Sequence, residues 1–231
     1  MGMFLRRGLA PHRTRMSDLE IGRSIKLNLN GTPWDWLVVH QGLPSAIYDD
    51  SCNGTWLLMN DIYKKRVWNG AKINKYESSP IHTYLNNEFL NLFDSNIKDA
   101  IKQVKIPYRE NGGSDGTDQS GANGLSAKIF LLSGYEVGWT TSDSSFFPVD
   151  GAKLSYFESG TGTSADIKRI AKWNGSAASW WLRSQNINFT SRVLCVVQDG
   201  GFGSYTTSGS YGIRPAIILP SDMLVTDDML A

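Results

Sequence analysis

The chain has 231 residues, enough for one large domain or two small ones, and no linker or shift in composition divides it. Its 23 basic and 22 acidic residues leave a formal net charge of +1, so the molecule as a whole has no electrostatic footprint for nucleic acid. No apolar run approaches the roughly 20 residues that a membrane-spanning helix needs, so we expect no membrane insertion.

The first elements are an arm and a hairpin. Residues 1–17 show no periodic pattern and contain several arginines, which predicts a flexible or docking N-terminal arm, followed by one domain over residues 18–231. Apolar and polar residues alternate over residues 24–29, as in a half-buried strand. Asn30-Gly31 favours a tight turn, so residues 34–40 are predicted to return as the partner strand.

Two short helices are predicted after the next strand. Residues 56–59 are fully apolar and indicate that strand. Ser79 is a suitable N-cap and Pro80 suits the first helical turn, so a helix should begin there. A second helix is predicted from Asp94, and a strand over residues 104–108. We expect both helices to cover one face of a sheet.

No metal site or disulfide framework is expected. The polar loop over residues 110–124 contains Asp115 and Asp118, but their spacing does not fit a twelve-residue calcium loop. Cys52 and Cys195 are too few for a disulfide framework and are predicted to be buried small hydrophobic residues. We therefore expect no cofactor.

The next part of the chain mixes strands with apolar loops. Residues 128–132 are predicted to form a buried strand. Residues 134–139 and 146–151 are rich in aromatic residues and glycine, which favours ordered loops lying over the sheet. A short helix is predicted over residues 151–157 and a strand over residues 168–173.

The C-terminal part reads as four strands. They are predicted over residues 179–183, 193–198, 204–207 and 213–219, with Asp199-Gly200-Gly201 as the turn between the second and the third. The residues between the apolar ends are small, polar and aromatic, a composition that dominates adaptable recognition surfaces. The C-terminal part therefore predicts a binding face held by a fixed frame.

Motifs for chemistry are lacking. The sequence contains no HExxH, G-x-S-x-G, phosphate-binding loop or C-x-x-C pattern, so we expect no enzyme. Glu136 and Asp150 lie in aromatic-rich stretches where burial could raise the pKa of a carboxyl group. Arg183 and Arg214 lie between core residues and are the expected ion-pair partners of these acids.

The chain resembles a family of phage and prophage proteins at residues 180–184 (Trp-Trp-Leu-Arg-Ser), 199–200 and 211–216. Members of this family end in a C-type-lectin-like domain related to the formylglycine-generating-enzyme type. The resemblance extends upstream through residues 54–59, 81–86 and 120–139. It implies an α+β, C-type-lectin-like fold with short helices on a twisted, mostly antiparallel sheet with long ordered loops.

The resemblance also implies a function. Many relatives are targets of diversity-generating retroelements, which rewrite adenines in the codons of a C-terminal segment. We therefore expect a virion or tail-tip protein, made in the bacterial cytoplasm, that recognises a host-cell surface protein or glycan through a variable face over residues 185–210. Other virion proteins would contact the arm, and copies of the chain would associate with one another.

Two groups of residues follow from this interpretation. The frame is expected to contain Trp180, Trp181, Arg183 and Arg214. The residues of the variable face are expected to be Gln185, Asn186, Asn188, Phe189, Ser191, Arg192, Phe202, Ser204, Tyr205, Thr207 and Ser208. Aromatic residues and arginine dominate interface hot spots, so Phe189, Arg192, Phe202 and Tyr205 are the expected anchors.

Departures from the family limit the alternatives. Catalytic members of the wider fold use C-terminal cysteines, and this chain has only Cys195 there. Calcium-dependent lectins of the fold carry Glu-Pro-Asn or Gln-Pro-Asp, and the sequence contains neither. The alternatives are a structural virion protein that uses the same face for subunit contacts and, with less support, a glycan-acting enzyme with two carboxylates.

Overall fold

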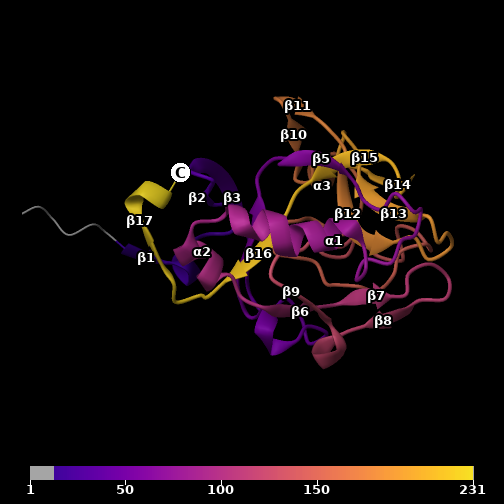
Figure 1. Cartoon of the computed structure of the whole chain (residues 1–231), viewed down its shortest axis with the longest axis horizontal. Coiled ribbons are helices and arrows are strands. Elements are labelled where there is room, and N and C mark those ends of the chain that lie inside the picture. Colours follow the sequence, from indigo (N-terminus) through magenta and orange to yellow (C-terminus); the bar gives the residue numbers. More distant parts are fainter. Residues whose placement is uncertain (1–12, 231) are drawn as a thin grey trace, which may run out of the picture.

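A computed structural model describes residues 13–230, which form a mixed α/β structure that is mostly sheet (Figure 1). The two larger sheets have strand orders β16-β4-β3-β2 and β14-β13-β12-β15-β5. Short helices and mostly antiparallel sheets are thus as predicted. The strands of these sheets are β2 (Ser24–Leu29), β3 (Thr32–Gly42), β4 (Gly54–Met59), β5 (Lys64–Val67), β12 (Trp180–Gln185), β13 (Arg192–Val196), β14 (Phe202–Thr206), β15 (Ser210–Ile213) and β16 (Ala216–Leu219).

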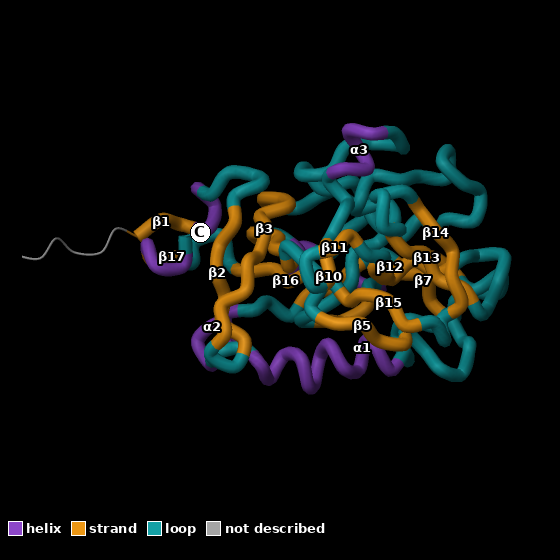
Figure 2. Tube along the Cα trace, turned by 90° about the horizontal axis from the view of Figure 1, so that it is seen from above, coloured by secondary structure: helices purple, strands orange, loops and turns teal. Residues whose placement is uncertain are grey.

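The predicted hairpin and the first helix are confirmed. Strands β2 and β3 pair antiparallel, and Asn30 and Gly31 between them have φ of 49° and 75°, the left-handed values that this turn requires. Ser79 caps α1 (Pro80–Tyr84) by accepting a hydrogen bond from the His82 backbone at 3.2 Å. Helix α1 continues as a π-turn and lies below β5 and β15 in Figure 2.

The other helices and the small sheets surround this frame. Helix α2 (Ser95–Ala100) begins after Asp94, as predicted, with Ile97 buried. Helix α3 is Thr163–Ile167. The remaining strands form two-stranded antiparallel pairs: β6 (Val104–Ile106) with β9 (Leu125–Ala127), β7 (Tyr108–Glu110) with β8 (Thr117–Gln119), and β10 (Lys172–Trp173) with β11 (Ser176–Ala177).

Residues 13–17, the last part of the predicted N-terminal arm, are part of the fold. Strand β1 (Arg13–Arg15) pairs antiparallel with β17 (Leu224–Thr226), and the Met16 backbone donates to the Met223 carbonyl at 2.8 Å. Arg13 and Arg15 are exposed and the strand buries no apolar side chain, so residues 13–15 carried no hydrophobic alternation that would indicate a strand. The rest of the predicted arm, residues 1–12, lies outside the described residues.

The strand predicted over residues 213–219 is instead two strands in two different sheets. Strand β15 pairs with β5 in the five-stranded sheet, whereas β16 pairs with β4 in the four-stranded sheet. The crossing falls at Arg214-Pro215, and Pro215 cannot donate a hydrogen bond to a ladder. One apolar run therefore joins the two sheets.

Three further predictions fail locally. Residues 129–132 are buried, but the segment makes a single bridge, from Phe130 to Ala216, because the Asn86 side chain holds the backbone of Lys128 and Ile129. Residues 151–154 are irregular and a turn follows at residues 155–156, so no helix is present there. The strand predicted over residues 168–173 covers only its last two residues.

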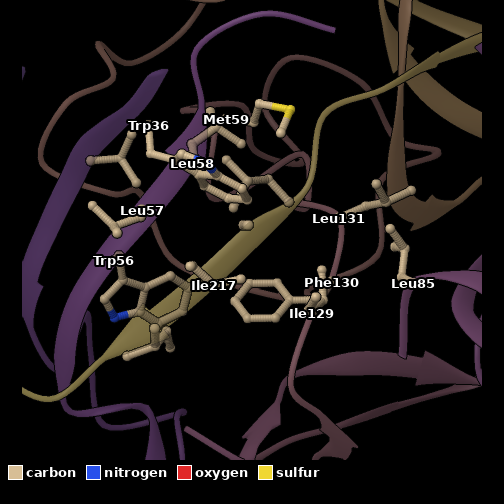
Figure 3. Close-up of a cluster of buried hydrophobic side chains, with 14 of the residues drawn as sticks. Trp36, Trp56, Leu57, Leu58, Met59, Leu85, Ile129, Phe130, Leu131 and Ile217 are labelled. Atoms are coloured by element: carbon tan, nitrogen blue, oxygen red, sulfur yellow. The ribbon is translucent and has the colours of Figure 1, made fainter. Parts of the chain in front are cut away.

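One cluster of buried side chains fills the space between the sheets (Figure 3). Trp56, Leu57 and Ile217 of the four-stranded sheet belong to this cluster. The Phe130 ring packs edge-on against that of Trp56, with 5.6 Å between the ring centres. Burial of such large aromatic and aliphatic surfaces is the main stabilising contribution in a domain of this size. Within residues 13–230, no helix is long and apolar enough to cross a membrane.

Candidate ligand-binding face

Strand β12 forms the buried floor of the predicted face. All six of its residues are buried, and Trp180 and Trp181 are fully enclosed. The indole of Trp180 donates to the Arg169 carbonyl at 3.0 Å, and that of Trp181 donates to the Arg66 carbonyl at 2.9 Å. Both tryptophans therefore bury a large apolar surface without leaving a polar atom unpaired.

Arg183 is held by a buried ion pair. Its guanidinium reaches the two carboxylate oxygens of Glu136 at 2.6 and 2.7 Å, which confirms the predicted pairing of these residues. Its remaining donors go to the carbonyls of Pro107, Leu131 and Asp150 at 2.8–3.0 Å. All five guanidinium N–H groups are thus used, which is what a buried arginine requires.

Tyr48 and Ser184 complete this buried network. The Tyr48 hydroxyl donates to Glu136 at 2.9 Å, and burial, followed by the Glu136 charge, raises the pKa of Tyr48 well above its usual value. Ser184 donates to one oxygen of Asp150 at 2.7 Å. The other oxygen of Asp150 has no partner among the described residues, and burial raises the pKa of Asp150 to about 7.

The prediction that Arg214 also partners a buried acid is wrong. Its guanidinium donates to the carbonyls of Met59 and Asn60 at 2.8 and 2.9 Å and lies 5.0 Å from the centre of the Trp180 ring. Burial lowers the pKa of Arg214 to about 10. Arg214 therefore fixes the crossing between the two sheets through backbone carbonyls and a cation–π contact.

The loop over residues 186–191 lies at the end of this floor and is held by Asn74. The buried Asn74 side chain lies within hydrogen-bonding distance of the carbonyls of Asn186, Phe189 and Arg192, at 3.3, 2.9 and 2.8 Å. The Asn74 backbone N–H donates to the Thr190 carbonyl at 2.8 Å. One residue from a distant segment thus fixes the backbone of the whole loop.

The loop directs several side chains into solvent. Asn188 is exposed. Phe189 is 56% exposed and is the one aromatic residue among the exposed large hydrophobic side chains of residues 13–230. The Arg192 guanidinium lies 5.5 Å from the centre of the Phe189 ring and donates to the Ser204 carbonyl at 3.0 Å. An exposed aromatic ring beside an ordered arginine is typical of an interface anchor.

Phe202 and Tyr205 point to opposite sides of the sheet because they lie an odd number of residues apart on β14. The Phe202 ring contacts those of Trp139, Phe146 and Phe147, with 5.4–6.0 Å between ring centres. The Tyr205 ring instead stacks on that of Tyr211 at 4.8 Å. The predicted face is therefore divided, with the 186–191 loop, Arg192, Phe202 and Ser204 separated from Tyr205.

Three residues predicted for the face are buried and hold the loop. Gln185 donates to the Arg109 carbonyl at 2.9 Å, and Asn186 donates to the Ser204 hydroxyl at 2.9 Å. Thr207 is fully buried, and its backbone carbonyl accepts from Trp68 and Asn69. Their polar side chains suggested exposure, but Gln185 belongs to the buried strand β12, and Asn186 and Thr207 are the first residues after β12 and β14. Ser191 and Ser208 are half-buried.

Asn74 anchors the loop of the candidate face and was not predicted from the sequence. It is separated from the loop by more than 100 residues and lies in an unpatterned polar stretch, so only the contact itself identifies it. Phe146 is half-buried over β14, in keeping with the apolar loop predicted to lie over the sheet.

The part of the chain that the structure describes contains no metal site and no exposed cysteine thiol. Residues 13–230 contain no group of His, Cys, Asp or Glu side chains suited to a metal ion. Asp118 pairs with Arg109 at 2.9 Å and accepts from the Val149 backbone. Cys52 and Cys195 are free and buried, as predicted, and burial raises the pKa of the Cys52 thiol to about 12.

These features define a mixed α/β protein with an exposed loop on a buried sheet. A family model described as a domain of unknown function (DUF6273) matches residues 53–221, well over half of the chain, so the protein belongs to this family. The match includes the Arg183–Glu136 ion pair, the 186–191 loop and strands β12 to β16. No curated protein and no solved structure matches the sequence.

Proposed function

We propose that this protein is a virion or tail-tip protein of a phage that binds a host-cell surface component through the 186–191 loop and Arg192. The observation that carries the proposal is the contrast within the loop. Asn74 fixes its backbone, while Asn188 and Phe189 remain exposed. A rigid backbone lowers the entropy cost of binding, and exposed side chains on it can change without loss of the fold.

The proposed fold is of the C-type-lectin-like type. The mostly antiparallel sheets, the short helices and the long ordered loops over residues 134–151 support it, together with the motifs at residues 180–184 and 211–216. Diversification by a retroelement is part of the proposal. It would act on the accessible positions Asn188, Phe189, Ser191, Arg192, Ser204, Tyr205 and Ser208, whereas Gln185, Asn186 and Thr207 would resist change because they are buried.

The proposed partners are a surface protein or glycan of the host, other virion proteins and further copies of the chain. Many copies on one particle would multiply a weak single-site affinity. Glu136 and Asp150 are fully buried and are held by Arg183 and Ser184, so neither carboxylate reaches an open cleft where a glycan could be hydrolysed.

The test is binding of the purified chain to a panel of gut bacterial cells. The test variant combines Asn188→Ala, Phe189→Ser and Arg192→Ser. The control variant combines Arg15→Ser and Leu224→Ser, which also removes an exposed arginine and an exposed apolar side chain, from strands β1 and β17 at the other end of the molecule (Figure 1). Both variants should melt like the parent.

We expect the parent and the control to bind at least one strain and the test variant to lose that binding. If no strain binds and the parent associates with itself through Phe189, the face makes subunit contacts and the host-recognition proposal fails. Sedimentation of the parent and of the test variant measures this self-association.

A further inference from the structure

A second surface, on the opposite side of β14 from Phe202, combines cations with aromatic rings. On the edge strand β5, the Arg66 guanidinium lies 3.7 Å from the centre of the Tyr84 ring, and the Lys64 ammonium lies 4.6 Å from it. Lys64 is also 5.7 Å from the centre of the Tyr63 ring. Tyr84 is the last residue of α1, which lies beside β5 (Figure 2), and its ring contacts both charged side chains.

The aromatic surface continues across the sheet. Tyr211 on β15 lies directly opposite Arg66, so the two side chains share one face of the sheet. Tyr205 extends this row, because its ring stacks on Tyr211 at 4.8 Å with an interplanar angle of 15°. We call this row the cation–aromatic strip; it consists of Tyr63, Lys64, Arg66, Tyr84, Tyr205 and Tyr211.

The charges of the strip are not neutralised within residues 13–230. No carboxylate of the described residues lies within 4 Å of Lys64, Lys65 or Arg66, although Lys26, Arg109 and Lys168 each have such a partner. All six residues of the strip except Tyr84 keep partial exposure, and β5 is the edge strand of its sheet. The strip therefore offers accessible positive charge beside accessible tyrosine rings.

We propose that the cation–aromatic strip binds an acidic polysaccharide, with sugar rings against the tyrosines and carboxylates against Lys64 and Arg66. Guanidinium and ammonium groups pair with carboxylates, and tyrosine supplies a rigid apolar surface with a polar tip. The net charge of +1 gives the molecule no overall electrostatic footprint for the phosphate backbone of a nucleic acid, whereas a polysaccharide can lay its sugar rings on the tyrosines and meet the two cations with its carboxylates. The inference goes beyond the proposed function, because it adds a second site on the other side of β14 from Phe202 and names its ligand as a glycan.

The probe is polygalacturonate, a uniform chain of acidic sugars, and its methyl ester serves as the uncharged control polymer. The parent is compared with a variant that combines Lys64→Gln and Arg66→Gln, which keeps much of each side chain over Tyr84. The control combines Arg15→Gln and Arg23→Gln, two exposed arginines of the β1–β2 region. Binding is measured by calorimetry at low and at physiological salt.

We expect the parent and the control variant to bind polygalacturonate, and the Lys64→Gln/Arg66→Gln variant to bind about tenfold more weakly. Affinity should fall with salt and nearly vanish for the methyl ester. The inference is overturned if polygalacturonate does not bind, if the ester binds equally well, if the variant binds like the parent, or if oligothymidylate binds more tightly than the polysaccharide.

Failure of this inference and failure of the proposed function give different results. Loss of cell binding in the Asn188/Phe189/Arg192 variant, without any binding of polygalacturonate, overturns the glycan inference alone. Binding of polygalacturonate that depends on Lys64 and Arg66, with no bacterial strain bound, supports the strip as a glycan site and overturns host recognition through the 186–191 loop.

Discussion

Strand β12 and the 186–191 loop adjoin in the chain and differ in what holds them. The side chains of β12 are all buried, and they pack in the core or take part in the Arg183 network. A substitution in this strand therefore changes the contacts that hold the strand in place. The loop is held through backbone carbonyls by Asn74, a residue from another segment. Because its own exposed side chains contribute little to that anchoring, they can vary while the backbone stays in place.

The largest effect is expected where β12 meets Glu136. Arg183→Met leaves the Glu136 carboxylate buried without its cation, which should lower the free energy of unfolding by about 4 kcal/mol. Urea denaturation measures the loss. The double variant Arg183→Met/Glu136→Leu removes the unpaired charge and should recover part of it. Equal stability of Arg183→Met and the parent would contradict a structural role for this ion pair.

Asp150 should make the stability of this frame depend on pH. Its pKa is about 7 in the folded protein and near 3.8 when unfolded, so the folded state binds the proton more tightly. The stability it contributes is present below about pH 4 and is lost as the pH rises to 7, on the order of 3 kcal/mol. The facing charged groups are Arg183, Glu136 and Asp118.

Asp150→Asn should remove this dependence because the amide does not titrate. Urea unfolding of the variant and the parent at pH 5 and pH 8 gives the difference in their free energies of unfolding. The contributions of the other carboxylates are common to both proteins and cancel in this difference. We expect the variant to gain stability relative to the parent from pH 5 to pH 8. A difference that stays constant over this range would show that Asp150 does not titrate there.

A smaller effect is expected at the anchor of the loop. Asn74→Ala removes the hydrogen bonds to three carbonyls and should cost about 2 kcal/mol. Amide hydrogen exchange over residues 186–192 should become faster, while β12 stays protected. Asn91→Ala is the matched control, since the exposed Asn91 donates to the Asn87 carbonyl and accepts from the Lys98 ammonium, and the loss of these surface bonds should change little. Unchanged exchange in the loop would contradict the anchoring role of Asn74.

The sequence predicted the elements whose signals are local. Asn30-Gly31 indicated the first hairpin, Ser79-Pro80 the start of α1, and the apolar runs most of the C-terminal strands. Contacts between distant segments were not predictable in this way. Residues 128–132 have a strand-like composition, but the Asn86 and Tyr76 side chains occupy their backbone groups, so no continuous ladder forms.

The exposure of the residues predicted for the face followed only partly from the composition. Asn188, Phe189 and Arg192 are exposed as expected, because their neighbours are small and polar. Asn186 and Thr207 share that composition and are buried, since the turns at the two ends of β13–β14 direct them inward. Composition distinguishes adaptable segments from core, whereas the direction of Asn186 and Thr207 depends on how the chain leaves β12 and β14.

The smallest effect on stability is expected at the exposed tip, and this result would sharpen the contrast with β12. Phe189→Ser and Arg192→Gln should each change the free energy of unfolding by about 0.5 kcal/mol or less, since exposed cation–π and surface contacts are weak. A double-mutant cycle should give a coupling free energy of about 0.5 kcal/mol between Phe189 and Arg192. Losses above about 2 kcal/mol at either position would mean that the tip supports the fold, and a tip of that kind could not vary freely as a recognition surface.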